Sequence, residues 1–439
     1  MGEIAKRLTV FAGISLLLCF CLSGCFMKSG NELYAVPRHL DEQAGLDSAV
    51  SSLLSENRGF CAPVEGENRQ TVQFADLDGD GSDEAIAFLK EKDSSVPLQA
   101  HILNRPDGFY RDCCVVGGDG ADFQSAAYIQ LDEKPGLELL LTRHVSSSLP
   151  ALLNVYSFRD GAIHDLLSEA GAEYTAADLD ADGAQELLLF YTRGTEQKKA
   201  VLYKRSEGEL FPDQTVLLSE DLPADVKIQT ADLAWGLPAV FVSGQCPDGS
   251  VLTDVLVLWN GELINLNRSD MDIGDITRCL GDFFPTDVDS DGIMELPKRI
   301  ALPGEETADN FLLLWYSIGL DGAVTEKLRT YQNSSAGWYL VIPERWGEQL
   351  TVQTDSDGSV CFAQWRQNDA PIPIFTIYTF SGEGRNAHGV SDGRFILSEK
   401  GSVTYSASFG TSTWAGLLTQ EQMKQMFNFI HSDWITSET

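Results

Sequence analysis

The stretch Asp178-Leu179-Asp180-Ala181-Asp182-Gly183-Ala184-Gln185-Glu186 decides what the rest of this chain can be. Carboxylates stand at its positions 1, 3, 5 and 9, and a glycine stands at position 6. This spacing gathers hard oxygen donors around one point, because the glycine permits a sharp turn that folds alternate side chains inward. Ca²⁺ takes roughly 6–8 oxygen ligands in a flexible shell. The stretch therefore predicts a calcium-binding loop.

Two further stretches repeat this spacing, Asp76–Glu84 and Asp287–Glu295, so the loop is a recurring unit. An EF-hand, the common helical calcium loop, needs a glutamate at position 12. The three loops place other residues there, namely Ala87, Leu189 and Lys298. Each loop is followed instead by a short apolar run such as Leu187–Tyr191. Such runs are typical of buried strands, so the loops are predicted to lie between β-strands.

The three loops predict about three structural Ca²⁺ ions and no other cofactor. In each loop the side chains of positions 1, 3, 5 and 9 and the main-chain carbonyl of position 7 are the expected ligands. These residues are Asp76, Asp78, Asp80, Ser82 and Glu84 in the first loop, Asp178, Asp180, Asp182, Ala184 and Glu186 in the second, and Asp287, Asp289, Asp291, Ile293 and Glu295 in the third.

Two weaker copies of the loop begin at Gln130 and Asp232, and the five copies together define a repeat of about fifty residues. Each unit also carries a late turn between apolar stretches, at Gly108, Gly161, Gly208, Gly261 and Gly322. Glycine turns of this kind are typical of hairpins. Four strands repeated at this period are the signature of β-propeller blades. Stacking would bury the two apolar faces that one blade alone leaves exposed.

The predicted fold class is therefore mainly β, with a calcium-loop β-propeller of at least five blade-like repeats of four antiparallel strands. The propeller is expected over residues 59–334, where the repeat runs. Residues 335–439 combine short apolar runs with an amphipathic helix expected over Thr419–Trp434, which begins with a capping box of Thr419 and Gln422. A separate small α+β domain is preferred there, and additional blade material is the alternative.

The loops and their flanking strands resemble the FG-GAP and VCBS repeats of integrin alpha-type β-propellers. The residues that carry this resemblance are Phe74-Ala75-Asp76-Leu77 before a loop and Glu186-Leu187-Leu188-Leu189 after one. It covers roughly residues 60–330 and implies structural calcium. Two units depart from the pattern, because Lys134 replaces the fifth-position acid and the loop at Asp232 lacks two acids; those loops are expected to hold no metal. The chain is also similar to lipoproteins of clostridial-type bacteria, which implies architecture but no activity.

The N-terminal segment is predicted to be a lipoprotein signal peptide, residues 1–24. A charged start with Lys6 and Arg7 precedes an apolar run that ends in Leu22-Ser23-Gly24-Cys25, a bacterial lipobox. Acylation of Cys25 would anchor the chain to the extracytoplasmic face of the bacterial cell membrane without spanning it. An ordinary secretory signal is the alternative. Residues 25–58 are expected to form a tether and a short helix, which is patterned over Leu46–Leu54.

The net charge of the chain limits the classes of partner that it can bind. The formal net charge of −34 disfavours nucleic acid, which would be repelled. No catalytic constellation is recognisable: Gly389–Gly393 matches the GxSxG pattern but lacks the buried strand and the helix that a nucleophile elbow needs. Six cysteines remain beyond Cys25, and most are expected to be small core residues, with pairing left open: Cys61, Cys113, Cys114, Cys246, Cys279 and Cys361.

We expect a surface-tethered binding, adhesion or scaffold module for a protein or glycan, with an envelope enzyme or accessory factor acting on polysaccharide as the alternative. The loops between the second and third strands of each unit vary most, and function tends to lie on irregular loops. The candidate partner-binding residues on them are Arg143, His144, Arg193, Lys198 and Lys199. Five tryptophans are candidates for a glycan platform or, as favoured, for the core: Trp259, Trp315, Trp338, Trp346 and Trp365.

Overall fold

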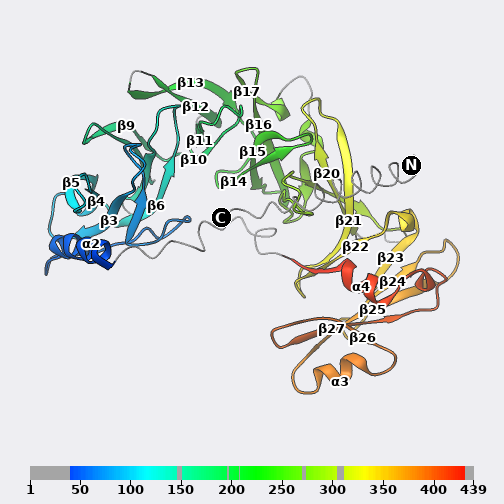
Figure 1. The fold of residues 1–439 in the computed structure, drawn as a ribbon. Helices are drawn as coiled ribbons and strands as arrows, with labels where there is room; N and C mark the ends of the chain where they lie inside the picture. The colour runs from blue at the N-terminus through cyan, green and yellow to red at the C-terminus, as the bar shows by residue number, and fades with distance from the viewer. Residues whose placement is uncertain are drawn as a thin grey trace, which may run out of the picture.

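The computed structural model describes residues 40–145, 151–194, 197–206, 208–268, 273–303 and 311–430 (Figure 1). The predicted signal peptide and the lipid site at Cys25 lie outside these residues. Within the described part, no helix combines the length and the apolar character needed to cross a membrane. The helix predicted in the tether is present as α2 (Leu40–Leu53), which begins earlier than the pattern indicated.

Antiparallel strands that follow one another in the chain form the first four sheets. The first sheet holds β1 (Arg58–Phe60), β2 (Val72–Ala75), β3 (Glu84–Glu91), β4 (Leu98–Asn104) and β5 (Arg111–Gly118), with β1 and β2 both on β3. The second holds β6 (Asp122–Ile129), β7 (Glu138–His144), β8 (Leu152–Arg159) and β9 (Ala162–Ala170). The third holds β10 (Glu173–Ala177), β11 (Glu186–Tyr191), β12 (Lys199–Ser206) and β13 (Glu209–Leu217). The fourth holds β14 (Lys227–Leu233), β15 (Leu237–Gln245), β16 (Ser250–Trp259) and β17 (Glu262–Asn265), with β18 (Arg278–Leu280) also on β16.

Two more sheets complete the described chain. The fifth runs in the order β19 (Leu296–Ala301), β20 (Phe311–Ile318), β21 (Val324–Asn333), β22 (Trp338–Ile342) and β28 (Phe427–Phe429). The sixth runs β23 (Leu350–Thr354), β24 (Val360–Gln364), β25 (Ile372–Ser381), β27 (Val403–Phe409) and β26 (Phe395–Lys400), with the short helix α3 (Arg385–Val390) between β25 and β26. The predicted series of four-stranded antiparallel units is thus confirmed as a series of sheets.

The fifth unit departs from the repeat at both ends. Its first strand is reduced to a single bridge, Thr286 to Glu295, on the two sides of the third acidic loop. At its other end β22 pairs with β21, from Arg329 opposite Ile342 to Asn333 opposite Trp338. The domain boundary expected between residues 334 and 335 therefore falls between two hydrogen-bonded strands.

The core is divided into layers, each lying between two successive sheets. In β11, Leu187 and Leu189 pack in the layer toward the second sheet, whereas Leu188 and Phe190 pack in the layer toward the fourth. This follows from the alternation of side chains in a strand, and it explains why the run is apolar at every position. Figure 1 shows the sheets following one another along an arc in sequence order.

The arc is open at its first sheet. The outer face of that sheet packs against α2, where Val50 and Leu53 contact the layer of Ala85, Ala87 and Leu89. A helix thus covers the face that another blade would cover in a closed propeller. Within the described residues the predicted propeller is therefore present only as a stack of antiparallel sheets, without a closed ring (Figure 1).

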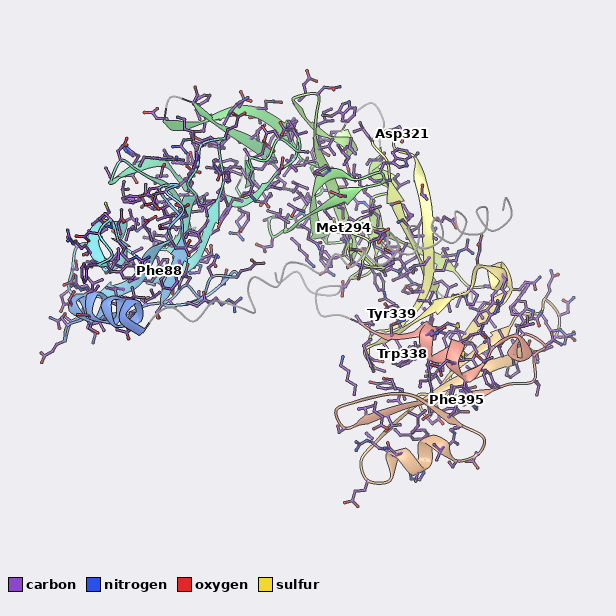
Figure 2. All side chains as sticks on the ribbon, in the orientation of Figure 1. Phe88, Met294, Asp321, Trp338, Tyr339 and Phe395 are labelled. Carbon is purple, nitrogen blue, oxygen red and sulfur yellow. The ribbon has the colours of Figure 1, made fainter. Side chains whose placement is uncertain are left out.

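The C-terminal sheet shares a core with the fifth sheet. Trp338 from β22 and Phe362 from β24 belong to one buried cluster, and Figure 2 shows Trp338 where the two sheets meet. Helix α4 (Gln420–Met426) begins with the predicted capping box. Its predicted continuation toward Trp434 is wrong, because Phe427–Phe429 turns into a strand on β22. The rings of Phe427 and Phe429 both pack on Tyr405, an arrangement that extended backbone provides.

The six cysteines of the described residues are free thiols. Cys246 and Cys279 are buried, as expected for small core residues, whereas Cys113 is exposed.

Candidate functional site

Each of the three acidic loops is a tight turn built by its own carboxylates. In the first loop, Asp76 accepts hydrogen bonds from the backbone N–H groups of Gly79 and Gly81 at 2.7 and 3.0 Å. The glutamate at position 9 folds back over the loop, and Glu84 Oε2 accepts from the Leu77 N–H at 2.9 Å. The same return contact joins Glu186 to Leu179 at 2.7 Å in the second loop and Glu295 to Val288 at 3.0 Å in the third.

The predicted ligand side chains converge. One carboxylate oxygen from each member of three triads lies within 4.8 Å of the others. The triads are Asp76, Asp78 and Glu84; Asp178, Asp180 and Glu186; and Asp287, Asp289 and Asp291. Oxygen atoms at these separations fit around one ion whose metal–oxygen distances are about 2.3–2.6 Å. The structure thus brings together three of the four predicted carboxylates in each loop, with Asp80, Asp182 and Glu295 outside the three triads.

The glutamates at position 9 are placed where a positive charge would be stabilised. Burial, followed by the neighbouring aspartates, raises the pKa of Glu84, Glu186 and Glu295 to about 7. Glu84 and Glu295 are almost completely inaccessible, and Oε1 of Glu295 is buried without a hydrogen-bond partner. A buried carboxylate oxygen of this kind costs free energy unless a cation or donor satisfies it. These donors fit Ca²⁺.

The carboxylates of the weaker loop of the second sheet are paired with cationic side chains of the protein. Glu138 is fully buried and still makes the return contact, to Leu131 N–H at 3.1 Å. Arg159 Nη2 lies 3.2 Å from Glu138 Oε1, and Arg205 Nη1 contacts Glu138 and lies 3.2 Å from Asp132 Oδ2. Two guanidinium groups thus neutralise the carboxylates that remain, which gives a physical reason for the expectation that this loop holds no metal.

The third loop is intermediate between these two situations. Lys327, from β21 of the fifth sheet, places its Nζ 2.6 Å from Asp291 Oδ2 and 3.8 Å from Glu295 Oε1. The hydrogen bond to Asp291 raises the pKa of Lys327, so the amine is held in its charged form. An ammonium group beside the carboxylates competes with any ion that they would bind.

The loop at Asp232 lacks the acids of positions 3 and 5 and is held by backbone hydrogen bonds to the next unit. The Asp232 N–H donates to Gly292 O at 3.2 Å, and the Met294 N–H donates to Asp232 O at 2.9 Å. Backbone bonds also join the weaker loop of the second sheet to its two neighbours, from Leu137 N–H to Asp76 O of the first loop at 2.9 Å and from Gln185 N–H of the second loop to Gln130 O at 2.6 Å. Successive loops therefore brace one another along one edge of the stack.

The predicted partner-binding residues lie near the opposite edge, but they are engaged within the chain. Arg143 is only 5% exposed, and its guanidinium donates to Asn154 Oδ1 at 2.9 Å and to Asp119 O at 2.8 Å. The prediction of direct partner contact is wrong for Arg143, because a buried guanidinium is not accessible. His144 Nδ1 lies 2.8 Å from Asp122 Oδ1.

The other three cations of that set also have internal partners. Arg193 pairs with Asp225 at 2.9 Å and with Glu173 at 3.4 Å. Lys198 donates to Glu220 O at 2.7 Å, and Lys199 lies over the Tyr191 ring at 5.2 Å from its centroid. These contacts brace the variable loops, so less free positive charge is offered to a partner than the sequence indicated.

Two exposed tryptophans line one hollow, and the sequence indicated only one of them, Trp259, as a candidate. Trp315, Trp338 and Trp346 are buried, as the core interpretation predicted, whereas Trp259 is 43% exposed. Trp235, in the degraded loop of the fourth sheet, is 79% exposed. The two line a shallow hollow of about 610 Å³ together with Leu237, Leu320 and Asp321. A bulky residue directly before a turn glycine, Trp235 before Gly236, was the signal that sequence reasoning missed.

Comparison with known proteins gives no family for this chain. No family model matches, and no curated protein matches. Among solved structures, the rhamnogalacturonan lyase YesW is 14% identical with a TM-score of 0.31, covering 71% of this chain and 67% of its own. The exotype rhamnogalacturonan lyase YesX is 12% identical with a TM-score of 0.32, and the match covers 72% of this chain and 70% of YesX. A 6-phosphogluconolactonase-like protein of Bacteroides fragilis is 10% identical with a TM-score of 0.28, and the match covers 71% of this chain and 96% of that protein. Likenesses this distant carry no argument about fold or activity.

Proposed function

We propose that this chain is a calcium-stabilised, propeller-like scaffold, lipid-anchored through Cys25 outside the cell membrane, that presents a binding surface to a protein or glycan. The observation that carries the proposal is the convergence of Asp76, Asp78 and Glu84, and of their counterparts in the second loop, on the same geometry. The FG-GAP-like pattern of these loops supports the propeller assignment.

Bound calcium would supply charge neutralisation rather than chemistry. The side chains of Asp178, Asp180, Asp182 and Glu186 and the carbonyl of Ala184 would hold it in the second loop, and their counterparts would do so in the first. Because the loops join the first and second strands of a sheet and brace the neighbouring loops, neutralising their charge stabilises the stack.

The third loop is not equivalent to the first and second loops. Lys327 already contributes a positive charge to the third loop, so an ion there must displace the ammonium group or share the site with it. We therefore expect two sites of higher affinity, in the first and second loops, and a weaker one in the third.

Chelation tests the proposal. EDTA should lower the melting temperature, since a ligand that binds only the native state stabilises it by about 2.7 kcal/mol at a hundredfold excess over its Kd. The double variant Asp178→Asn/Asp180→Asn should lose part of the calcium-dependent shift. Asp357→Asn, in an acidic turn outside the three loops, serves as the control and should keep the full shift. Identical melts in EDTA and in calcium would overturn the proposal.

The anchor is tested separately. A Cys25→Ala variant lacks the thiol that acylation requires, so it should leave the membrane fraction, whereas the wild-type chain should stay there through a high-salt wash. Fractionation followed by immunoblotting measures this. A variant that remains in the membrane fraction under high salt would rule out Cys25 as the anchor.

A further inference from the structure

The hollow formed by Trp235 and Trp259, here called the tryptophan hollow, lies at the turns of the fourth and fifth sheets. Trp235 belongs to the turn between β14 and β15, and Trp259 ends β16. Leu320 and Asp321 come from the turn between β20 and β21, and Figure 2 shows Asp321 at the tip of that hairpin. The hollow is thus built from three turns of two neighbouring sheets.

Trp235 has a backbone conformation that does not suit its side chain. Its φ is +70°, in the left-handed region that costs a bulky residue free energy. Three other turns of the described residues place a residue in this region directly before a glycine, and there the residues are Asp160, Asn260 and Asp392. Those small polar residues tolerate the conformation. A tryptophan there, mostly exposed, gains little from burial, so its ring is better explained by an external contact than by folding.

The ring is nevertheless held in place. The Ala234 N–H donates to Ile318 O at 3.0 Å, which ties the turn to the fifth sheet. A Cβ added at Gly319 would lie 2.9 Å from Cζ3 of Trp235 and 2.8 Å from Oδ1 of Asp321. The absence of a side chain at Gly319 therefore lets the indole edge and a carboxylate approach the same point. The platform is preorganised, which lowers the ordering cost of binding.

The dimensions of the hollow favour a small or chain-like ligand over a protein partner. Its volume of about 610 Å³ lies within the roughly 300–1,000 Å³ typical of ligand sites. A stable protein interface buries about 800 Å² on each partner, far more than two indoles and their immediate neighbours supply. Aromatic faces next to a few polar groups are the usual lining of such sites.

The chemistry of the hollow fits a sugar. A pyranose ring presents an apolar face of C–H groups, which packs on an indole, and a rim of hydroxyl donors. Asp321 Oδ1 accepts from the Ala323 N–H at 3.0 Å, and a carboxylate has two oxygens with which to accept further hydrogen bonds. Two indoles from different turns offer space for successive rings of one chain.

The charge of the residues that line the hollow favours neutral over anionic sugars. None of the residues that line the hollow is a lysine or arginine, Asp321 is acidic, and the chain as a whole carries a formal charge of −34. An anionic polysaccharide would be repelled, because it would meet no counter-charge. A neutral glycan would carry no such penalty.

We propose that the tryptophan hollow binds a neutral glycan chain, with Trp235 and Trp259 as stacking platforms and Asp321 as a hydrogen-bond acceptor. The inference rests on the proposed function, since it names the ligand class of that binding module. Calcium is not among the groups proposed to contact the glycan, because the turn that carries Trp235 has no metal ligands.

Calorimetry with named probes tests it. Cellohexaose, xylohexaose, mannohexaose and chitohexaose serve as neutral chains, hexagalacturonic acid as an anionic chain, and an oligo-arginine peptide as a cationic one. At least one neutral chain should bind and protect tryptophan fluorescence from acrylamide quenching. Trp235→Gly should weaken that binding roughly tenfold, as loss of a central aromatic anchor does, while the melting temperature stays equal or rises.

Matched variants complete the design. Phe109→Ala removes another exposed aromatic, which is 69% exposed in the turn between β4 and β5 of the first sheet, and should leave binding unchanged. Asp321→Asn should weaken it less than Trp235→Gly does. Binding of the peptide or of the anionic chain alone, or of no probe, would overturn the proposal, as would a neutral chain bound equally by Trp235→Gly. If EDTA does not lower the melting temperature while the glycan still binds, only the calcium proposal is contradicted.

Discussion

At the scale of single residues, the acidic loops show three ways of balancing the same charge. The first and second loops gather carboxylates that could hold a metal ion, the third adds Lys327, and the weaker loop of the second sheet uses Arg159 and Arg205. The sequence predicted the carboxylates because their spacing is local. It did not predict the cations, because Arg205 reaches Glu138 from another sheet, 67 residues along the chain.

Arg205 makes the first residue-scale prediction. Arg205→Met leaves the fully buried Glu138 with one cation fewer, and breaking a buried pair typically costs about 3–5 kcal/mol. Urea unfolding measures the loss in the free energy of unfolding. Arg111→Met, which breaks an exposed pair with Asp107, should cost about 0–1 kcal/mol. Equal, small losses in both variants would contradict the role assigned to Arg205.

Burial explains where residue-scale prediction failed. Arg143 was predicted to meet a partner because it was assigned to a variable loop, but it lies in β7 and its guanidinium is turned into the sheet toward Asn154. Position along the sequence places a residue near a loop, whereas only the packing of neighbouring strands decides which way a long side chain turns.

At the scale of elements, local signals were sufficient for strands and hairpins. The period of the acidic loops and glycine turns correctly predicted the antiparallel sheets, and the capping box of Thr419 correctly predicted the start of α4. The end of α4 was not predictable from its own pattern. The two phenylalanines of Phe427–Phe429 suit either a helix or a strand. The segment forms a strand because it pairs with the edge of β22.

Helix α2 provides the prediction at this scale. Leu53 is 6% exposed and packs against the outer face of the first sheet, whereas the adjacent Leu54 is 37% exposed. Leu53→Ala should therefore lower the free energy of unfolding by about 2–4 kcal/mol, as core truncations do. Leu54→Ala should change it by less than about 1 kcal/mol. Equal effects in the two variants would mean that α2 does not cover the sheet.

At the scale of the whole molecule, the stack follows from what one sheet cannot do. Strands such as β11 are apolar on both faces, so each sheet needs a neighbour on either side. The inner sheets find neighbours in sequence order, the first sheet finds α2, and the fifth finds the sixth. The sequence predicted the stacking but not its ends, because the number of repeats does not specify whether a ring closes.

One calcium ion would act at all three scales: on a residue triad, on the connection between two strands and on the stability of the whole stack. The most direct measurement is the number of calcium ions retained per chain after equilibrium dialysis at micromolar Ca²⁺, determined by elemental analysis. We predict two ions for the wild-type chain, one for Asp178→Asn/Asp180→Asn, and three for Lys327→Met, in which the competing ammonium group is gone. Calcium absent from the wild-type chain, or a count that none of these substitutions changes, would contradict the account.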